Sequence, residues 1–129
     1  MSKKLFAILG FCGVVMALIL VACSATSTDT SSAPNQVHMN ATNFVQSSIT
    51  IKKGESITLI DDAQDSHIIA NGKWENGTAK TQDESGAPQV EDLQISGSGQ
   101  GTIGPFTTAG TFHFNCTVHP GMSLTVVVQ

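Results

Sequence analysis

Three side chains with metal-binding chemistry lie close together near the C-terminus of this sequence. Cys116, His119 and Met122 follow one another at intervals of three residues in the stretch NCTVHPGM. Pro120 and Gly121 favour a turn, and a turn can bring the imidazole and the thioether back toward the sulfur. These donors are soft and favour copper over magnesium or calcium. The alternative is a buried thiol, a surface histidine and a core methionine that merely fall together.

A blue copper site has a cysteine and two histidines in one plane, with a distant axial methionine. His67 is the candidate for the second histidine, because it begins a β-branched run directly after an acidic loop. His113 lies on the same strand as Cys116 but on the opposite face, so we interpret it as solvent-facing. We interpret His38 as a surface residue too. The residues thus predict one copper ion, and its predicted ligands are His67, Cys116, His119 and Met122.

Two other uses of these side chains fit less well. Structural zinc prefers four nitrogen, sulfur or carboxylate donors and rarely accepts a thioether. A catalytic cysteine–histidine pair needs a base that the fold places beside the thiol and a polar group that orients the base. His119 follows Cys116 by only three residues in a turn and is poorly suited to that role. We therefore predict that the protein is not an enzyme.

The elements that must position these residues have the periodicity of β-strands. Phe112, Phe114 and Cys116 share one face of their strand, which directs the thiol toward a core. No window of about a dozen residues carries a helical apolar stripe, so we expect an all-β, two-sheet antiparallel sandwich. The expected strands lie within 36–44, 47–54, 55–62, 66–72, 100–106, 110–116 and 123–129.

Residues 73–93 interrupt this rhythm. The segment is polar, contains the only tryptophan, Trp74, and shows no clear strand pattern after the Asn-Gly pair that ends the run at 66–72. A long excursion in a compact domain is usually a functional or a poorly ordered loop. Trp74 is a candidate for attaching this loop to the body of the domain.

The N-terminal residues have the pattern of a membrane-targeting signal. A basic start precedes a long apolar run, and LVAC at 20–23 resembles a bacterial lipobox. We predict a lipoprotein signal peptide at 1–22, lipidation of Cys23, a Ser/Thr-rich flexible tether over 23–35 and one domain over 36–129. The alternative is an uncleaved anchor helix. Either would hold the domain outside the cytoplasm, on the cell surface or the periplasmic face of a bacterial membrane.

The number of cysteines and the net charge restrict which functions the domain can have. Cys12 lies in the predicted signal and Cys23 at its end, so Cys116 is the only thiol of the domain. A lone thiol in an oxidising compartment is a liability unless it is buried or bonded. Past the signal, four lysines stand against ten acidic residues, a formal net charge of −6. Such a domain is a poor candidate for binding nucleic acid and a reasonable one for a basic protein partner.

The stretch GPFTTAGTFHFNCTVHPGM at 104–122 resembles the C-terminal signature of the cupredoxins, the plastocyanin/azurin family of small blue copper proteins. Its short loop with Pro120 is most similar to that of the amicyanins, and KGESITL followed by His67 resembles the first-ligand region. The resemblance implies a Greek-key antiparallel β-sandwich, one type 1 copper ion and one-electron transfer between redox protein partners. We expect a monomer without a small-molecule substrate.

One residue departs from the family pattern. Family members often carry Asn, Ser or Thr directly after the first histidine, where it helps to hold the loops and the cysteine sulfur, and here that residue is Ile68. Hydrogen bonds of this kind tune the reduction potential of a bound metal, so the reduction potentials of relatives do not apply to this chain.

For an electron carrier, we expect His119 to be the exit for the electron, bordered by an apolar patch at Pro120 and Gly121. Asp61, Asp62 and Asp65 are candidates for an acidic docking surface nearby.

Other functions remain as alternatives. A copper-storage or delivery protein would use the same ligands but needs an exchangeable site. A copper enzyme needs further histidine clusters, and a binuclear copper centre needs a second cysteine in the domain. A copper-free sandwich that binds a partner is the last alternative.

Overall fold

The computed structural model describes residues 34–129, and these form strands and no helix. The predicted signal peptide, Cys23 and nearly all of the predicted tether lie outside the described residues. Within 34–129, no helix is long and apolar enough to cross a membrane. The strands are β1 (Gln36–Met39), β2 (Ser48–Ile51), β3 (Ile57–Asp61), β4 (Ser66–Glu75), β5 (Thr78–Thr81), β6 (Leu93–Ser96), β7 (Gln100–Ile103), β8 (Gly110–Cys116) and β9 (Ser123–Val128).

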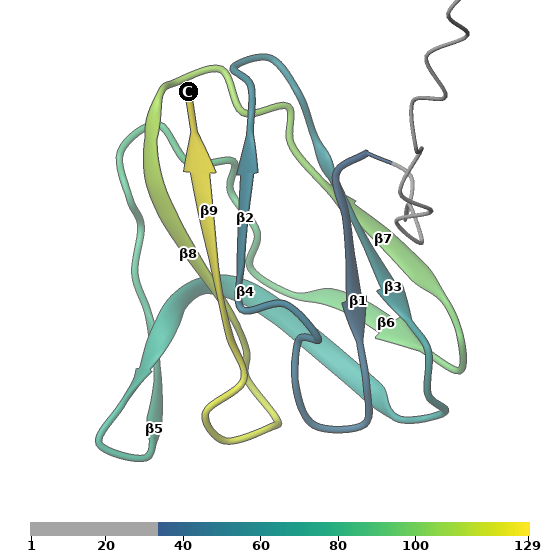
Figure 1. The fold of residues 1–129 in the computed structure, drawn as a ribbon. Coiled ribbons are helices and arrows are strands. Elements are labelled where there is room, and N and C mark those ends of the chain that lie inside the picture. The colour runs from purple at the N-terminus through teal and green to yellow at the C-terminus, as the bar shows by residue number, and fades with distance from the viewer. Residues whose placement is uncertain (1–33) are drawn as a thin grey trace, which may run out of the picture.

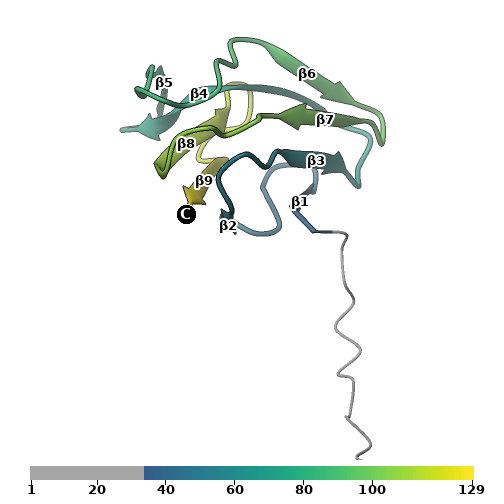
Figure 2. The same cartoon turned by 90° about the horizontal axis from the view of Figure 1, so that it is seen from above.

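The strands form two sheets, which confirms the predicted all-β sandwich (Figures 1 and 2). One sheet has the order β1-β3-β7 and the other β2-β9-β8-β4-β5, while β6 pairs with the first half of β4. The pairs β1–β3 and β2–β9 are parallel, so both sheets are mixed rather than wholly antiparallel. The reason is that the chain leaves the first sheet after β1, forms β2 in the second and returns, so β3 runs beside β1 in the same direction.

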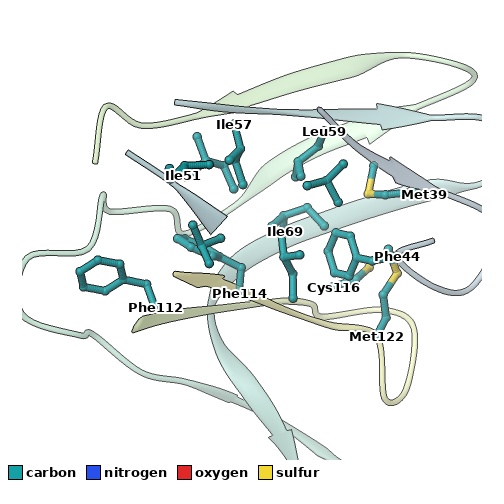
Figure 3. Packing of buried hydrophobic residues seen from close by; sticks show 14 of the residues in the cluster. Met39, Phe44, Ile51, Ile57, Leu59, Ile69, Phe112, Phe114, Cys116 and Met122 are labelled. Carbon is teal, nitrogen blue, oxygen red and sulfur yellow. The ribbon is translucent and has the colours of Figure 1, made fainter. Parts of the chain in front are cut away.

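The core lies between the sheets and is built from alternating positions (Figure 3). On β3, Ile57 and Leu59 are buried, whereas Thr58 between them is partly exposed. On β8, Phe112, Phe114 and Cys116 are buried, as their shared face predicts. This alternation places the thiol at the end of the core, where apolar neighbours exclude water from it.

The strand β4 extends beyond its expected end. Asn71-Gly72 was expected to end it, but β4 continues to Glu75, and the reversal occurs at the second Asn-Gly pair, Asn76-Gly77. Both residues of that pair have positive φ, 49° and 75°, as a two-residue hairpin turn requires. Gly72 has a different role, because the backbone oxygen of Lys80 occupies the place that a side chain would take.

Residues 73–93 therefore contribute partly to strands. Side-chain hydrogen bonds connect the rest of the segment to the larger sheet. The Asn71 amide donates to the Pro88 carbonyl oxygen at 3.0 Å and accepts from the Val90 N–H at 2.5 Å. The Glu84 carboxylate accepts from the His113 backbone N–H at 2.6 Å. The β4–β5 hairpin lies at the same end of the sandwich as the loop between β8 and β9 (Figure 1).

Candidate metal centre

Three of the four predicted ligands converge at one end of the sandwich. The donor atoms of His67, Cys116 and His119 all lie within 4.8 Å of one another. The Cys116 Sγ is 3.4 Å from the His119 Nδ1, and the two imidazole centroids are 4.8 Å apart. Nitrogen and sulfur ligands of a tetrahedral zinc ion lie about 2.0–2.3 Å from the metal, so they are roughly 3–4 Å from one another. The cluster is close to that spacing and fits one small transition-metal ion.

Met122 closes the loop that carries these donors. Its N–H donates to the His119 carbonyl oxygen at 3.1 Å, and its own carbonyl oxygen accepts from the Cys116 N–H at 3.0 Å. Its side chain is 1% exposed. Figure 3 shows the side chains of Cys116 and Met122 pointing toward one another beside Phe44. Met122 is therefore buried in the loop that also carries His119.

The pairing of β4 with β8 brings the distant histidine to the cysteine. Ile69 on β4 is opposite Cys116 on β8, and the Thr117 N–H donates to the Ile68 carbonyl oxygen at 2.8 Å. The Thr117 hydroxyl donates to the same oxygen at 3.3 Å. Thr117 thus joins the two ligand segments through the backbone carbonyl of Ile68, whose own side chain has no hydrogen-bonding group.

The environment of His67 suits a metal ligand. Its side chain is fully buried, and neither ring nitrogen has a hydrogen-bond partner. Burial lowers the pKa of His67, and His119 lowers it further, whereas Asp61, Asp65 and the nearby backbone of Asn40 raise it. A lowered pKa keeps the imidazole neutral at pH 7, with a lone pair free for a metal. Buried polar atoms without partners are costly, and metal coordination would satisfy one of them.

The other two histidines of the described chain lie apart from this cluster. His113 Nδ1 is 2.7 Å from Glu84 Oε1, and His38 Nδ1 is 2.8 Å from Asp62 Oδ2. Each imidazole is therefore within hydrogen-bond distance of a carboxylate. This agrees with the interpretation that neither is a ligand.

Asp61 does not lie where the sequence suggested. Asp62 and Asp65 are exposed, but Asp61 is 2% exposed. The reason is the alternation of β3, which points Asp61 into the core on the same face as Leu59.

Trp74 attaches the β4–β5 hairpin to the site itself. Its indole N–H donates to the Cys116 carbonyl oxygen at 2.9 Å. The sequence indicated Trp74 as an anchor, but its partner lies 42 residues away, and no local pattern could identify it.

We expect Trp74→Phe to lower the free energy of unfolding of the copper-free protein by about 1–2 kcal/mol, because it removes a donor from a carbonyl near the core. Chemical denaturation measures this change. Lys73→Ala on the same hairpin is the control, since Lys73 makes only a surface ion pair with Glu75 at 3.4 Å and its loss should cost little. Equal effects of the two variants would contradict a role for the indole hydrogen bond.

Comparison with known proteins decides the family. The family model described as copper binding proteins, plastocyanin/azurin family, matches residues 32–129. The chain belongs to this family. The resemblance of its C-terminal stretch to the cupredoxins is thereby confirmed. Family and donor set together identify the cofactor as a single type 1 copper ion.

Solved cupredoxin structures share the fold. Amicyanin from Paracoccus versutus (Thiobacillus versutus) is 21% identical with a TM-score of 0.58, covering 78% of this chain and 86% of amicyanin. A purple cupredoxin from Nitrosopumilus maritimus is 17% identical with a TM-score of 0.52, covering 73% of this chain and 98% of that one. No match to a curated protein was found.

Proposed function

We propose that this cupredoxin is a single-electron carrier, tethered to the outer face of a bacterial membrane, that exchanges electrons with redox protein partners. In this proposal His67, Cys116, His119 and Met122 would hold the copper ion. The observation that carries the proposal is the convergence of one buried thiol and two imidazoles, with donor atoms within 4.8 Å of one another.

The bound copper ion supplies the one-electron couple, and the chain supplies a rigid, dry site. Cys116 and His67 are both completely buried, so water is kept from the two innermost donors. His67 and Cys116 lie on paired strands, and the last two ligands lie in a short loop closed by backbone hydrogen bonds. Side chains held in this way would move little between the two oxidation states, which would lower the reorganisation energy of electron transfer.

His119 offers the route to a partner. It is partly exposed, whereas the other three proposed ligands are buried. Pro120, Gly121 and Val118 beside it are exposed, and Val118 reaches 48% exposure. A small apolar surface on a domain with excess negative charge suits brief docking with a basic redox protein, since such encounters use small interfaces.

The extracytoplasmic location is supported by the N-terminal sequence. The apolar run and LVAC at 20–23 have the form of a lipoprotein signal. Mass spectrometry of the membrane-bound protein tests this part of the proposal. A mature chain that begins at a lipid-modified Cys23 is the expected result, and an intact N-terminus would indicate the uncleaved anchor instead.

Copper titration followed by redox cycling tests the carrier function. One equivalent of Cu(II) should produce an intense visible charge-transfer band with narrow copper hyperfine splitting in the EPR spectrum. The band should disappear and return on one-electron reduction and oxidation, and a chelator should remove the copper slowly. Rapid loss to the chelator would favour copper delivery, and a weakly coloured adduct would overturn the proposal.

A further inference from the structure

A buried carboxylate lies beside His67. Asp61 Oδ1 is 3.7 Å from His67 Nε2, and both side chains are completely buried. The same Asp61 oxygen accepts from the Ala63 N–H at 2.9 Å, whereas Asp61 Oδ2 has no partner. Asp61 is not among the residues whose donor atoms converge. It therefore lies beside one imidazole without belonging to the set of donors that could hold a metal.

The backbone of β3 holds Asp61 in this position. The residue is opposite Met39 in the parallel β1–β3 pair, and its N–H donates to the Gly99 carbonyl oxygen at 3.0 Å. Its side chain points to the same core-facing side of β3 as Ile57 and Leu59. A carboxylate in such a place loses its hydration, which is costly unless a positive group lies close. Within residues 34–129, its only basic neighbour within salt-bridge distance is His67.

We propose that Asp61 is a positioning residue for the copper site, accepting a hydrogen bond from His67 Nε2–H and so turning His67 Nδ1 toward the metal. This inference rests on the proposed function, because it takes His67 to be a copper ligand. Metal-bound histidines commonly donate their second N–H to a carboxylate or a carbonyl, which fixes the ring and raises its basicity. The present 3.7 Å separation is longer than a hydrogen bond. The proposal therefore requires His67 Nε2 and Asp61 Oδ1 to come within hydrogen-bond distance when copper binds.

The charge of Asp61 favours the oxidised site. Cu(II) and one thiolate together carry a net charge of +1, which the Asp61 carboxylate neutralises. Cu(I) and the thiolate are already neutral, so the same carboxylate leaves the reduced site with a net negative charge. Because the groups are buried, this difference is weakly screened. Asp61 should therefore strengthen Cu(II) binding and lower the reduction potential.

The variant Asp61→Asn tests the charge with little change in shape. An amide oxygen can still accept from the Ala63 N–H, and thermal unfolding of the copper-free variant checks that it folds. We expect Cu(II) affinity, measured by chelator competition, to fall by about 10-fold or more, and the reduction potential to rise. Asp62→Asn is the matched control, because it removes the same charge one residue away, where the side chain is 51% exposed and pairs with His38. Its affinity and potential should stay near those of the unmodified protein.

A second measurement, by NMR, tests the proposed hydrogen bond itself. In the diamagnetic Cu(I) form, NMR should show a slowly exchanging His67 Nε2–H signal that shifts or broadens in Asp61→Asn and not in Asp62→Asn. The nearby Asn40 backbone is the competing acceptor, and a signal unaffected by Asp61→Asn would assign the bond to it and overturn the inference. Equal potentials and affinities in the two variants would overturn it as well. If the unmodified protein forms no blue copper site, the proposed function has failed instead.

Discussion

Replacing Cys116 with serine should abolish the intense visible band of the copper-loaded protein. The band requires charge transfer from a thiolate to Cu(II), and a serine hydroxyl is a hard donor that stays protonated at neutral pH. Cys116 is completely buried, and serine is close to it in size, so the sandwich should persist. Cu(II) affinity should fall by more than about 100-fold, beyond the loss typical of residues that only support a ligand. Absorption and EPR spectra, with chelator competition, measure these changes.

His113→Gln is the matched control for this substitution. His113 is three residues before Cys116 on the same strand, but it points to the opposite face and contacts Glu84. Its loss should leave the band and the hyperfine splitting unchanged. A band that survives in Cys116→Ser, or that disappears in His113→Gln, would show that the colour does not arise from the proposed site.

Local spacing was enough to predict the part of the site that lies in one continuous segment. Cys116 and His119 belong to one strand and the turn that follows it, so the position of one restricts the position of the other. The face of Cys116 followed from its parity with Phe114, and both are fully buried. His67 could be selected only by excluding other histidines and by family resemblance, because the β4–β8 register that brings it to the cysteine is a long-range pairing.

Two features were missed for different reasons. The Asn-Gly pairs at 71–72 and 76–77 carry the same local turn signal, and only the approach of Lys80 to Gly72 distinguishes them. The burial of Asp61, by contrast, was available from the sequence. The alternation that buries Ile57 and Leu59 continues to position 61, but the neighbouring acidic residues suggested a solvated loop. The position of Asp61 in the alternation of β3 was thus the sequence signal of its burial.

Replacing Phe114 with alanine should have the largest effect on stability. Its ring is completely buried and packs edge-to-face against Phe106, with centroids 6.0 Å apart and an interplanar angle of 88°. Deleting a buried phenylalanine ring costs about 3–5 kcal/mol, and the total stability of a small domain is only about 5–15 kcal/mol. Chemical denaturation of the copper-free protein should therefore show a loss of a large fraction of its free energy of unfolding.

Two further substitutions separate core packing from other effects of changing Phe114. Phe114→Leu keeps most of the apolar volume and should cost clearly less than alanine. Val118→Ala, at a side chain that is 48% exposed, should be within about 0.5 kcal/mol of the unmodified protein. If Phe114→Ala were no more destabilising than Val118→Ala, the two sheets would not be packed through this ring. Because Phe114 and Cys116 share one face of β8, the support for the thiol would then have to come from the β4–β8 pairing and the loop that follows β8.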